Sequence, residues 1–168
     1  MKTVIFAAAA AAAFSAPAFA QDAAPFTGPR AGVTVGYDSL GNEGVSYGVS
    51  AGYDVALTPS ITFGPEVTLG DSTVDSAGVE VSRDLAASVR LGYVLNPQVL
   101  FFGKVGYANT RLEAENTNAG AALEGVRFGG GLEYAFNGNA YISAEYQRTE
   151  YEDDFSRDAG VVSIGFRF

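Results

Sequence analysis

The feature that most constrains the fold is a period-two alternation of apolar with small or polar residues, repeated along the chain. Successive side chains of a β-strand point to opposite faces, so this pattern predicts strands that each have one apolar face. Within one segment, Pro65 lacks a backbone N–H, so we expect a bulge or a local break in pairing there. The eight alternating segments are 31–38, 44–56, 61–70, 79–95, 99–108, 124–136, 140–149 and 160–168.

The connections between these segments are of two kinds. Short turns rich in Pro, Asn and Gly lie at 58–60, 96–98 and 137–139. Longer, mostly acidic stretches, which we expect to be loops, lie at 71–78, 109–123 and 150–159. A further turn is expected at 39–43, where Gly41 and Asn42 occur. This order predicts eight antiparallel strands arranged as four hairpins.

The apolar face of these segments is too bulky for the inside of a small barrel. An eight-stranded barrel has an interior just wide enough for side chains to fill it, which suits the Gly, Ser, Thr and Ala of the other face. The segment lengths match the roughly 9–11 residues that cross a bilayer, and closure satisfies every backbone group. Aromatic residues gather near both ends of the segments, as in interfacial girdles. The fold class predicted is all-β, an eight-stranded antiparallel up-and-down transmembrane β-barrel; a soluble sandwich with scattered core aromatics is the alternative.

The N-terminus predicts a secretory signal peptide over residues 1–20. Lys2 supplies a positive charge, an apolar stretch follows, and Ala18 and Ala20 provide small residues for cleavage after Ala20. The alternative is an alanine-rich helix packed on the domain. Residues 21–29 carry no periodicity and are expected to form a flexible periplasmic leader, so the barrel domain is expected over 30–168.

Composition excludes several classes of function. The chain has no cysteine and no histidine, so disulfides, thiolate chemistry and histidine bases are absent. A net charge of −9 argues against a nucleic-acid partner, which needs a basic surface. No loop has the spacing of a calcium site, so the acidic stretches are interpreted as solvated loops, although carboxylates that share divalent cations with lipopolysaccharide phosphates stay open. We predict no catalytic residue, no metal site and no cofactor.

The terminal segment 160–168 places Val162, Ile164, Phe166 and Phe168 on one face and ends on an aromatic residue. With its other segments, the chain resembles the small outer-membrane β-barrel family, which includes opacity-type surface proteins, OmpA-type transmembrane domains and short porin-family barrels. The resemblance implies a monomer in the bacterial outer membrane, in contact with the lipid bilayer and lipopolysaccharide. It also implies that Phe166 and Phe168 form the signal read by the barrel-assembly machinery.

Charged residues fall on the inward face by parity, where they must pair because isolated buried charges are unfavourable. The residues predicted to form this internal ion-pair network are Glu66, Arg90, Lys104, Arg127, Glu133, Glu145 and Arg167. The resemblance to OmpA-type barrels implies a network that blocks or gates the lumen. We also expect Leu100 and Phe102 to face inward and to narrow the mouth near the short turns.

The function predicted is a structural or surface-interaction role in the outer membrane, with a lumen filled by polar and charged side chains. A narrow, gated porin-like channel is the alternative. An envelope lipid-modifying enzyme is a weaker hypothesis, because such families use a histidine with a serine and this chain has no histidine. A soluble ligand-binding barrel is a fourth reading, and an extracellular ligand of unknown identity stays open.

Overall fold

The computed structural model describes residues 25–40, 42–72, 75–76, 79–114, 120–136, 139–151 and 156–168. Within these residues it has nine strands and no helix long and apolar enough to span a membrane. The strands are β1 (Gly28–Leu40), β2 (Asn42–Thr58), β3 (Ile61–Ser72), β4 (Asp75–Ser76), β5 (Val79–Asn96), β6 (Val99–Ala114), β7 (Gly120–Ala135), β8 (Ala140–Tyr151) and β9 (Ser156–Arg167).

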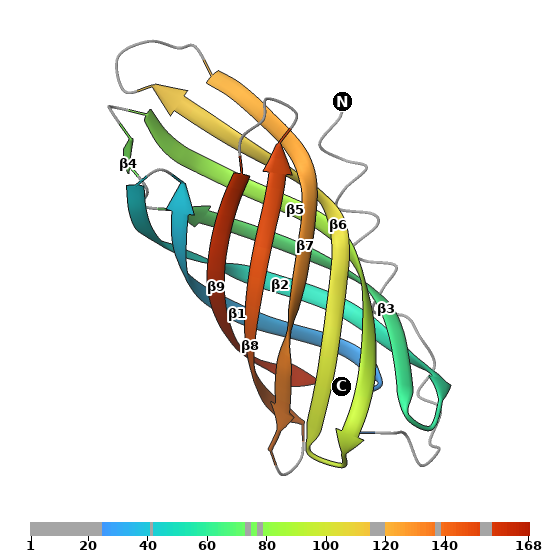
Figure 1. The fold of residues 1–168 in the computed structure, drawn as a ribbon. Helices are drawn as coiled ribbons and strands as arrows, with labels where there is room; N and C mark the ends of the chain where they lie inside the picture. The colour runs from blue at the N-terminus through green and yellow to red at the C-terminus, as the bar shows by residue number, and fades with distance from the viewer. Residues whose placement is uncertain are drawn as a thin grey trace.

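Eight of these strands are long, and they close into a barrel (Figure 1). Each long strand is antiparallel to its neighbours, and the two-residue β4 pairs only with the start of β5. Closure comes from β1 and β9, whose register runs from Arg30↔Arg167 to Ser39↔Asp158. The predicted eight-stranded antiparallel up-and-down barrel is confirmed.

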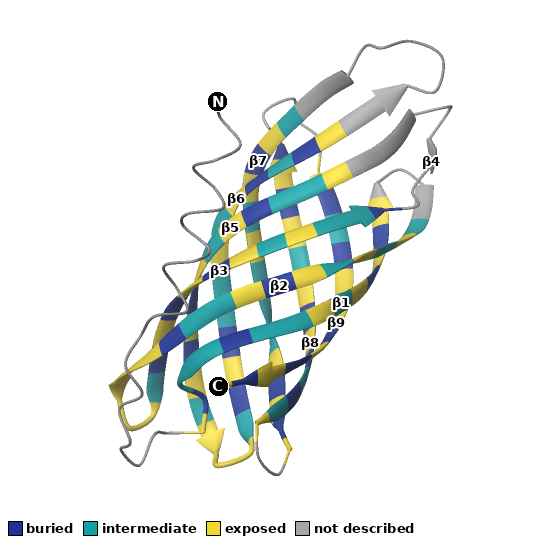
Figure 2. Ribbon diagram, turned by 180° about the vertical axis from the view of Figure 1, so that it is seen from behind, coloured by how far each residue is buried: buried dark blue, intermediate teal, exposed yellow. Residues whose placement is uncertain are grey.

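Burial alternates along every long strand, as Figure 2 shows. The exposed positions carry the large apolar residues, so the outer surface is the apolar face. Val33, Val105 and Ile164, for example, lie on the outside with 45–57% of their surface exposed. The inward positions carry Gly, Ser, Thr and charged residues, which explains how side chains fill so narrow a lumen.

The strands are longer than predicted at the end opposite the short turns. Parts of the stretches expected to be loops are paired backbone: β6 continues to Ala114, β7 begins at Gly120 and β9 begins at Ser156. The physical reason is that antiparallel pairing does not end where the apolar band ends, because polar side chains on a paired strand can face water. The remaining parts of those stretches, at 73–74, 77–78, 115–119 and 152–155, lie outside the described residues.

Pro65 interrupts one ladder, as expected. Pairing between β2 and β3 runs to Gly52↔Glu66 and resumes at Val55↔Phe63 in the same register. The missing pairs include the position where proline has no N–H to donate. On its other side Pro65 is aligned with Val89 of β5, so the barrel wall stays continuous.

The start of the barrel differs from the expectation of a flexible leader over 21–29. β1 begins at Gly28, and Phe26 is fully buried. Gly28 has a φ of 97°, a conformation open to glycine, and a Cβ there would lie 2.6 Å from the carbonyl oxygen of Phe168. The chain can therefore bend at Gly28 and return residue 26 to the lumen. The predicted signal peptide, with Ala18 and Ala20, and residues 21–24 lie outside the described residues.

Candidate functional site

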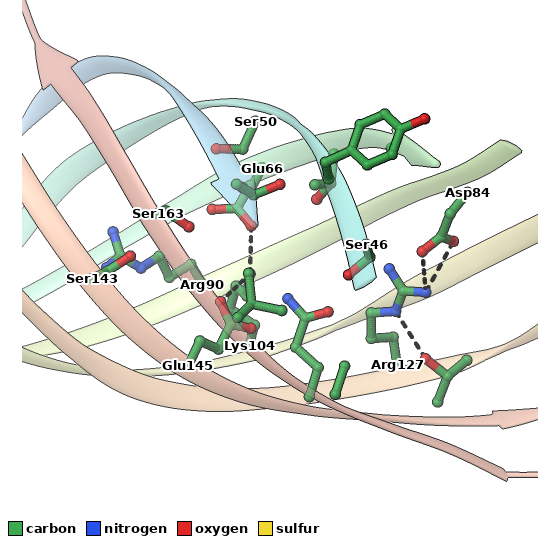
Figure 3. A pocket seen from close by; sticks show the side chains of 18 of the residues that line it. Ser46, Ser50, Glu66, Asp84, Arg90, Lys104, Arg127, Ser143, Glu145 and Ser163 are labelled. Atoms are coloured by element: carbon green, nitrogen blue, oxygen red, sulfur yellow. Dashed lines mark hydrogen bonds and ion pairs between the residues drawn. The ribbon is translucent and has the colours of Figure 1, made fainter. Parts of the chain in front are cut away.

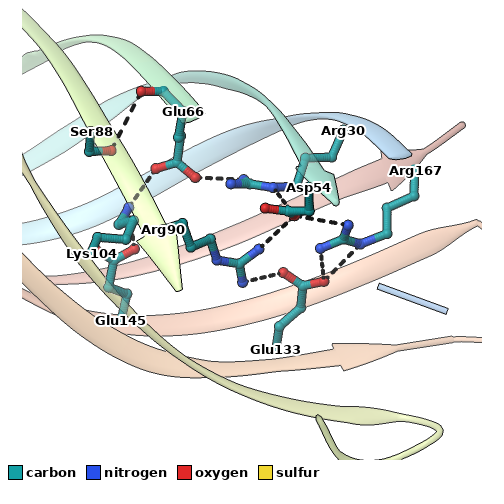
Figure 4. A network of polar contacts seen from close by, with 9 residues as sticks. All are labelled: Arg30, Asp54, Glu66, Ser88, Arg90, Lys104, Glu133, Glu145 and Arg167. Carbon is teal, nitrogen blue, oxygen red and sulfur yellow. Dashed lines mark hydrogen bonds and ion pairs between the residues drawn. The ribbon is translucent and has the colours of Figure 1, made fainter. Parts of the chain in front are cut away.

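Inside the barrel, near the short turns, one charged residue from each of the eight long strands joins a single network (Figure 4). We call it the turn-side cluster. It holds four acids and four bases, and none of its side chains is more than 9% exposed. In strand order its members are Arg30, Asp54, Glu66, Arg90, Lys104, Glu133, Glu145 and Arg167.

Asp54 is the hub of this cluster. Its Oδ2 accepts hydrogen bonds from Arg30 Nε at 2.8 Å and from Arg167 Nη1 at 3.0 Å. Arg90 Nη1 donates to the same oxygen at 3.3 Å. Arg30 and Arg167 are directly opposite each other on β1 and β9, so this carboxylate bridges two like charges that would otherwise repel across the closing ladder.

Glu133 completes the arginine side of the cluster. Its Oε2 accepts from Arg90 Nη2 at 2.7 Å. Its Oε1 accepts two bonds from Arg167, from Nη2 at 2.7 Å and from Nε at 3.0 Å. Each oxygen of Glu133 thus accepts from a different guanidinium, and these charge-assisted hydrogen bonds fix the carboxylate between Arg90 and Arg167.

Lys104 carries the network across to the remaining acids. Its Nζ lies 2.6 Å from Glu66 Oε1 and 2.7 Å from Glu145 Oε2. Glu66 Oε2 also accepts from Arg30 Nη1 at 2.5 Å. Lys104 and Glu145 are on β6 and β8, and the intervening β7 presents Gly129, whose Cβ would lie 2.2 Å from Glu145 Oε1. The missing side chain at Gly129 makes room for this bridge.

A second group of charges lies farther toward the long connections, and we call it the loop-side cluster. It holds two acids and two bases: Asp38, Asp84, Arg127 and Arg157. Arg127 Nη2 donates to both oxygens of Asp84, at 2.8 and 2.9 Å (Figure 3). Arg157 pairs with Asp38 and lies 3.4 Å from Asp84. Like the turn-side cluster, this one has no net charge.

An internal cavity of about 60 Å³ runs between the two clusters. Small hydroxyl side chains line it between the charges: Thr34, Ser46, Ser50, Thr68, Ser143 and Ser163. Such a volume holds only a few water molecules. No group of three or more metal-binding side chains occurs within the described ranges.

Between the turn-side cluster and the short turns, apolar side chains close the mouth of the barrel. Phe26, Leu100 and Phe102 are at most 2% exposed and pack with Ala135. The Arg90 guanidinium lies 3.9 Å from the centre of the Phe102 ring, a cation–π contact that joins the plug to the ion pairs. The inward orientation expected of Leu100 and Phe102 is confirmed.

The structure brings six of the seven charges named from the sequence into the turn-side cluster and places Arg127 in the loop-side one. Asp38, Asp54 and Asp84 join them. The alternation of the sequence already places these three residues on the inward face. Sequence reasoning missed Arg30, which precedes the first alternating segment, and Arg157, which fell in an expected loop. It also missed Phe26, because no periodicity precedes Gly28.

The two terminal phenylalanines lie apart from both clusters. Phe166 is outward and 57% exposed, and Phe168 is 70% exposed just after β9 ends. The backbone N–H of Phe168 donates to the carbonyl of Pro29 at 2.9 Å, so the last residue is held against the start of β1. The ring itself stays free on the apolar surface.

Comparisons with known proteins agree with this architecture. A family model described as an outer membrane protein β-barrel domain matches residues 6–168. A comparison with curated proteins finds no match. In fold, the chain is similar to Ail, the attachment invasion locus protein of Yersinia pestis, with 13% identity and a TM-score of 0.63 over 84% of this chain and 97% of that one.

Two further solved structures have the same fold. Neisserial surface protein A has 14% identity and a TM-score of 0.62, over 83% of this chain and 96% of that one. The N-terminal β-barrel domain of Pseudomonas aeruginosa OprF has 17% identity and a TM-score of 0.56, over 84% of this chain and 99% of that one. At such identities the likeness shows the fold alone.

The contacts of Lys104 lead to a stability prediction. Lys104→Met leaves two buried carboxylates short of a partner and is expected to lower the free energy of unfolding by roughly 3–5 kcal/mol. Lys104→Met/Glu145→Met keeps the cluster neutral and should lose less, because Glu66 retains Arg30. Arg148→Met removes an exposed pair with Glu150 and should lose about 1 kcal/mol or less. Urea unfolding in lipid vesicles measures all three, and equal losses for Lys104→Met and Arg148→Met would contradict the account.

Proposed function

The chain belongs to the outer membrane protein β-barrel family, and on this premise we propose that it is a closed barrel of the bacterial outer membrane that acts at the cell surface. The lumen in this proposal is a polar core that stiffens the barrel. The single observation that carries it is the turn-side cluster, in which every long strand contributes one charge. A conducting lumen would require these contacts to break.

A surface role is supported by the asymmetry of the two ends. The short turns leave little chain beyond the barrel at one end, and the acidic connections and strand extensions lie at the other. In this proposal the acidic end faces outside and presents a binding surface. Among proteins of the same fold, Ail is by name an attachment protein and has been crystallised with the heparin analogue sucrose octasulfate.

The charge of this chain favours a different kind of partner. The stretches 71–78, 109–123 and 150–159 carry more acids than bases, so they would repel a polyanion such as heparin. We therefore expect a partner surface that presents basic groups.

The chain purified in phosphatidylcholine nanodiscs should bind polylysine and not heparin, and changing Glu152, Asp153 and Asp154 to their amides should weaken polylysine binding. Equal or tighter binding of heparin would overturn the choice of partner.

Catalysis is not part of this proposal. The chain has no histidine and no cysteine, and the lumen acids of the two clusters are engaged in ion pairs. The structures of similar fold named above are outer-membrane barrels described by surface or barrel roles and not by a reaction. A carboxylate held by one or more cations is a poor general base, because the pairing favours its ionised form.

A narrow gated channel is the second candidate, favoured by the cavity between the two clusters. Planar-bilayer recording separates the two functions. We expect no steady conductance from the purified chain, and any openings should be brief, small and sensitive to pH, because protonating a carboxylate unpairs its cation. Phe26→Ala should make such openings more frequent by loosening the plug, and the outward Phe128→Ala should not. A large, steady, pH-independent current from the wild type would show a channel.

We also propose that Phe166 and Phe168 are read by the barrel-assembly machinery and that the folded protein is a monomer in contact with lipopolysaccharide. Support comes from the free apolar ring of Phe168 at the end of an outward face. Phe168→Asp should reduce the amount of folded barrel in the outer membrane, measured by heat-dependent gel mobility of envelope fractions. The matched control is Phe136→Asp, another exposed aromatic near a short turn. Equal yields of Phe168→Asp and wild type would remove this role.

A further inference from the structure

Two arginines face each other on the outer surface near the long connections. Arg83 of β5 and Arg111 of β6 are directly opposite in the ladder, and both are exposed. The register of these strands shifts between Val81 and Arg83, which marks a bulge one residue before the pair. Bulges re-aim neighbouring side chains, so this pairing is a specific local arrangement.

This placement stands out because the chain has few basic residues. It has 10 in total. Six lie in the two lumen clusters, Lys2 is outside the described residues, and Arg148 is paired with Glu150 and Asp158. The two that remain are Arg83 and Arg111. An acidic protein thus has its two remaining basic residues directly opposite each other on the outer surface of the barrel.

Like charges directly opposite in a ladder destabilise it unless an anion lies between them. Directly opposite residues have Cβ atoms about 4.5–5.5 Å apart, so two guanidinium groups can converge on one phosphate. Guanidinium groups bind phosphate through paired N–H donors, which suits this geometry. Arg111 already has an interaction within the chain, so a phosphate would be an additional partner for it.

The height of the pair also suits a lipid headgroup. Tyr47 and Tyr107 are outward and about half exposed, as expected of an interfacial girdle. Arg111 is four residues beyond Tyr107 on β6, roughly 13 Å along the strand. The arginines therefore lie just outside the apolar band, at the level where lipid phosphates are found.

We propose that Arg83 and Arg111 form a binding site for the phosphate group of a lipid in the adjoining leaflet. The competing account is neutralisation within the chain, because Glu124 of β7 is exposed and its ladder partner Asn109 is two residues from Arg111. The proposal rests on the outer-membrane location and does not require the surface partner described above.

Nanodiscs test the site without regard to the orientation of the protein in cells. The full chain is placed in phosphatidylcholine nanodiscs that contain diphosphoryl lipid A, or the same lipid with its phosphates removed. The nanodiscs are diluted into detergent, and the lipid that stays bound to the protein is measured. The thermal unfolding midpoint of the protein is measured in the intact nanodiscs. We expect the phosphorylated lipid to be retained about tenfold better by the wild type than the dephosphorylated one. We also expect it to raise the wild-type midpoint.

The double variant Arg83→Gln/Arg111→Gln should retain the phosphorylated and dephosphorylated lipids equally. Its thermal unfolding midpoint in phosphatidylcholine alone should equal that of the wild type, which would show that the variant folds. Arg148→Gln, the matched exposed arginine, should behave as wild type. Inorganic phosphate added to nanodiscs without lipid A tests the other source of the same chemistry; protection by it at equal concentration would show an anion site not specific for lipid. Undiminished retention of phosphorylated lipid A by the double variant would overturn the proposal and leave neutralisation within the chain.

Discussion

The barrel depends on one interaction more than on any other, the ring of ion pairs that takes a single charge from each long strand. Around the barrel, from β1 to β9, the signs follow the order plus, minus, minus, plus, plus, minus, minus, plus. Adjacent bases or acids are thus always flanked by opposite charges. Each carboxylate has at least one partner on a strand that is not its neighbour in sequence, so the ring ties together distant parts of the chain. Removing one member would leave the buried ring with an uncompensated charge, which is more destabilising than replacing a whole ion pair by apolar side chains of similar volume.

The remaining architecture accommodates this ring. The large apolar side chains face outward, where contact with lipid takes the place of a hydrophobic core. Charged and small residues occupy the inner face. Glycine matters most where a contact must cross a strand, as at Gly129 beneath the Lys104–Glu145 bridge. At the mouth, Phe26 and Phe102 exclude water from the cluster, which strengthens the electrostatic interactions inside. The interior of the barrel is therefore a packed core of charged and small side chains and not an open channel.

Sequence alternation predicted the number of strands and the face on which most lumen charges lie, because side-chain parity depends only on local geometry. It did not predict which charges meet. Partners such as Asp54 and Arg167 are 113 residues apart, and their contact depends on strand register, which alternation leaves open. Phe26 was missed for another reason, since its burial follows from a bend at Gly28 and from no periodic pattern. The strand extensions were missed because polar composition was equated with loops.

The claim that the interior is a packed core can be tested with one measurement, the reactivity of a single thiol in the lumen. The chain has no cysteine, so Ser163→Cys introduces one beside the cavity, where the native side chain is buried. Ser60→Cys, in an exposed short turn, gives the rate for open water. With a charged, water-soluble methanethiosulfonate reagent on folded protein in nanodiscs, residue 163 should react much more slowly than residue 60. Comparable rates at the two positions would show a water-filled path and contradict the account.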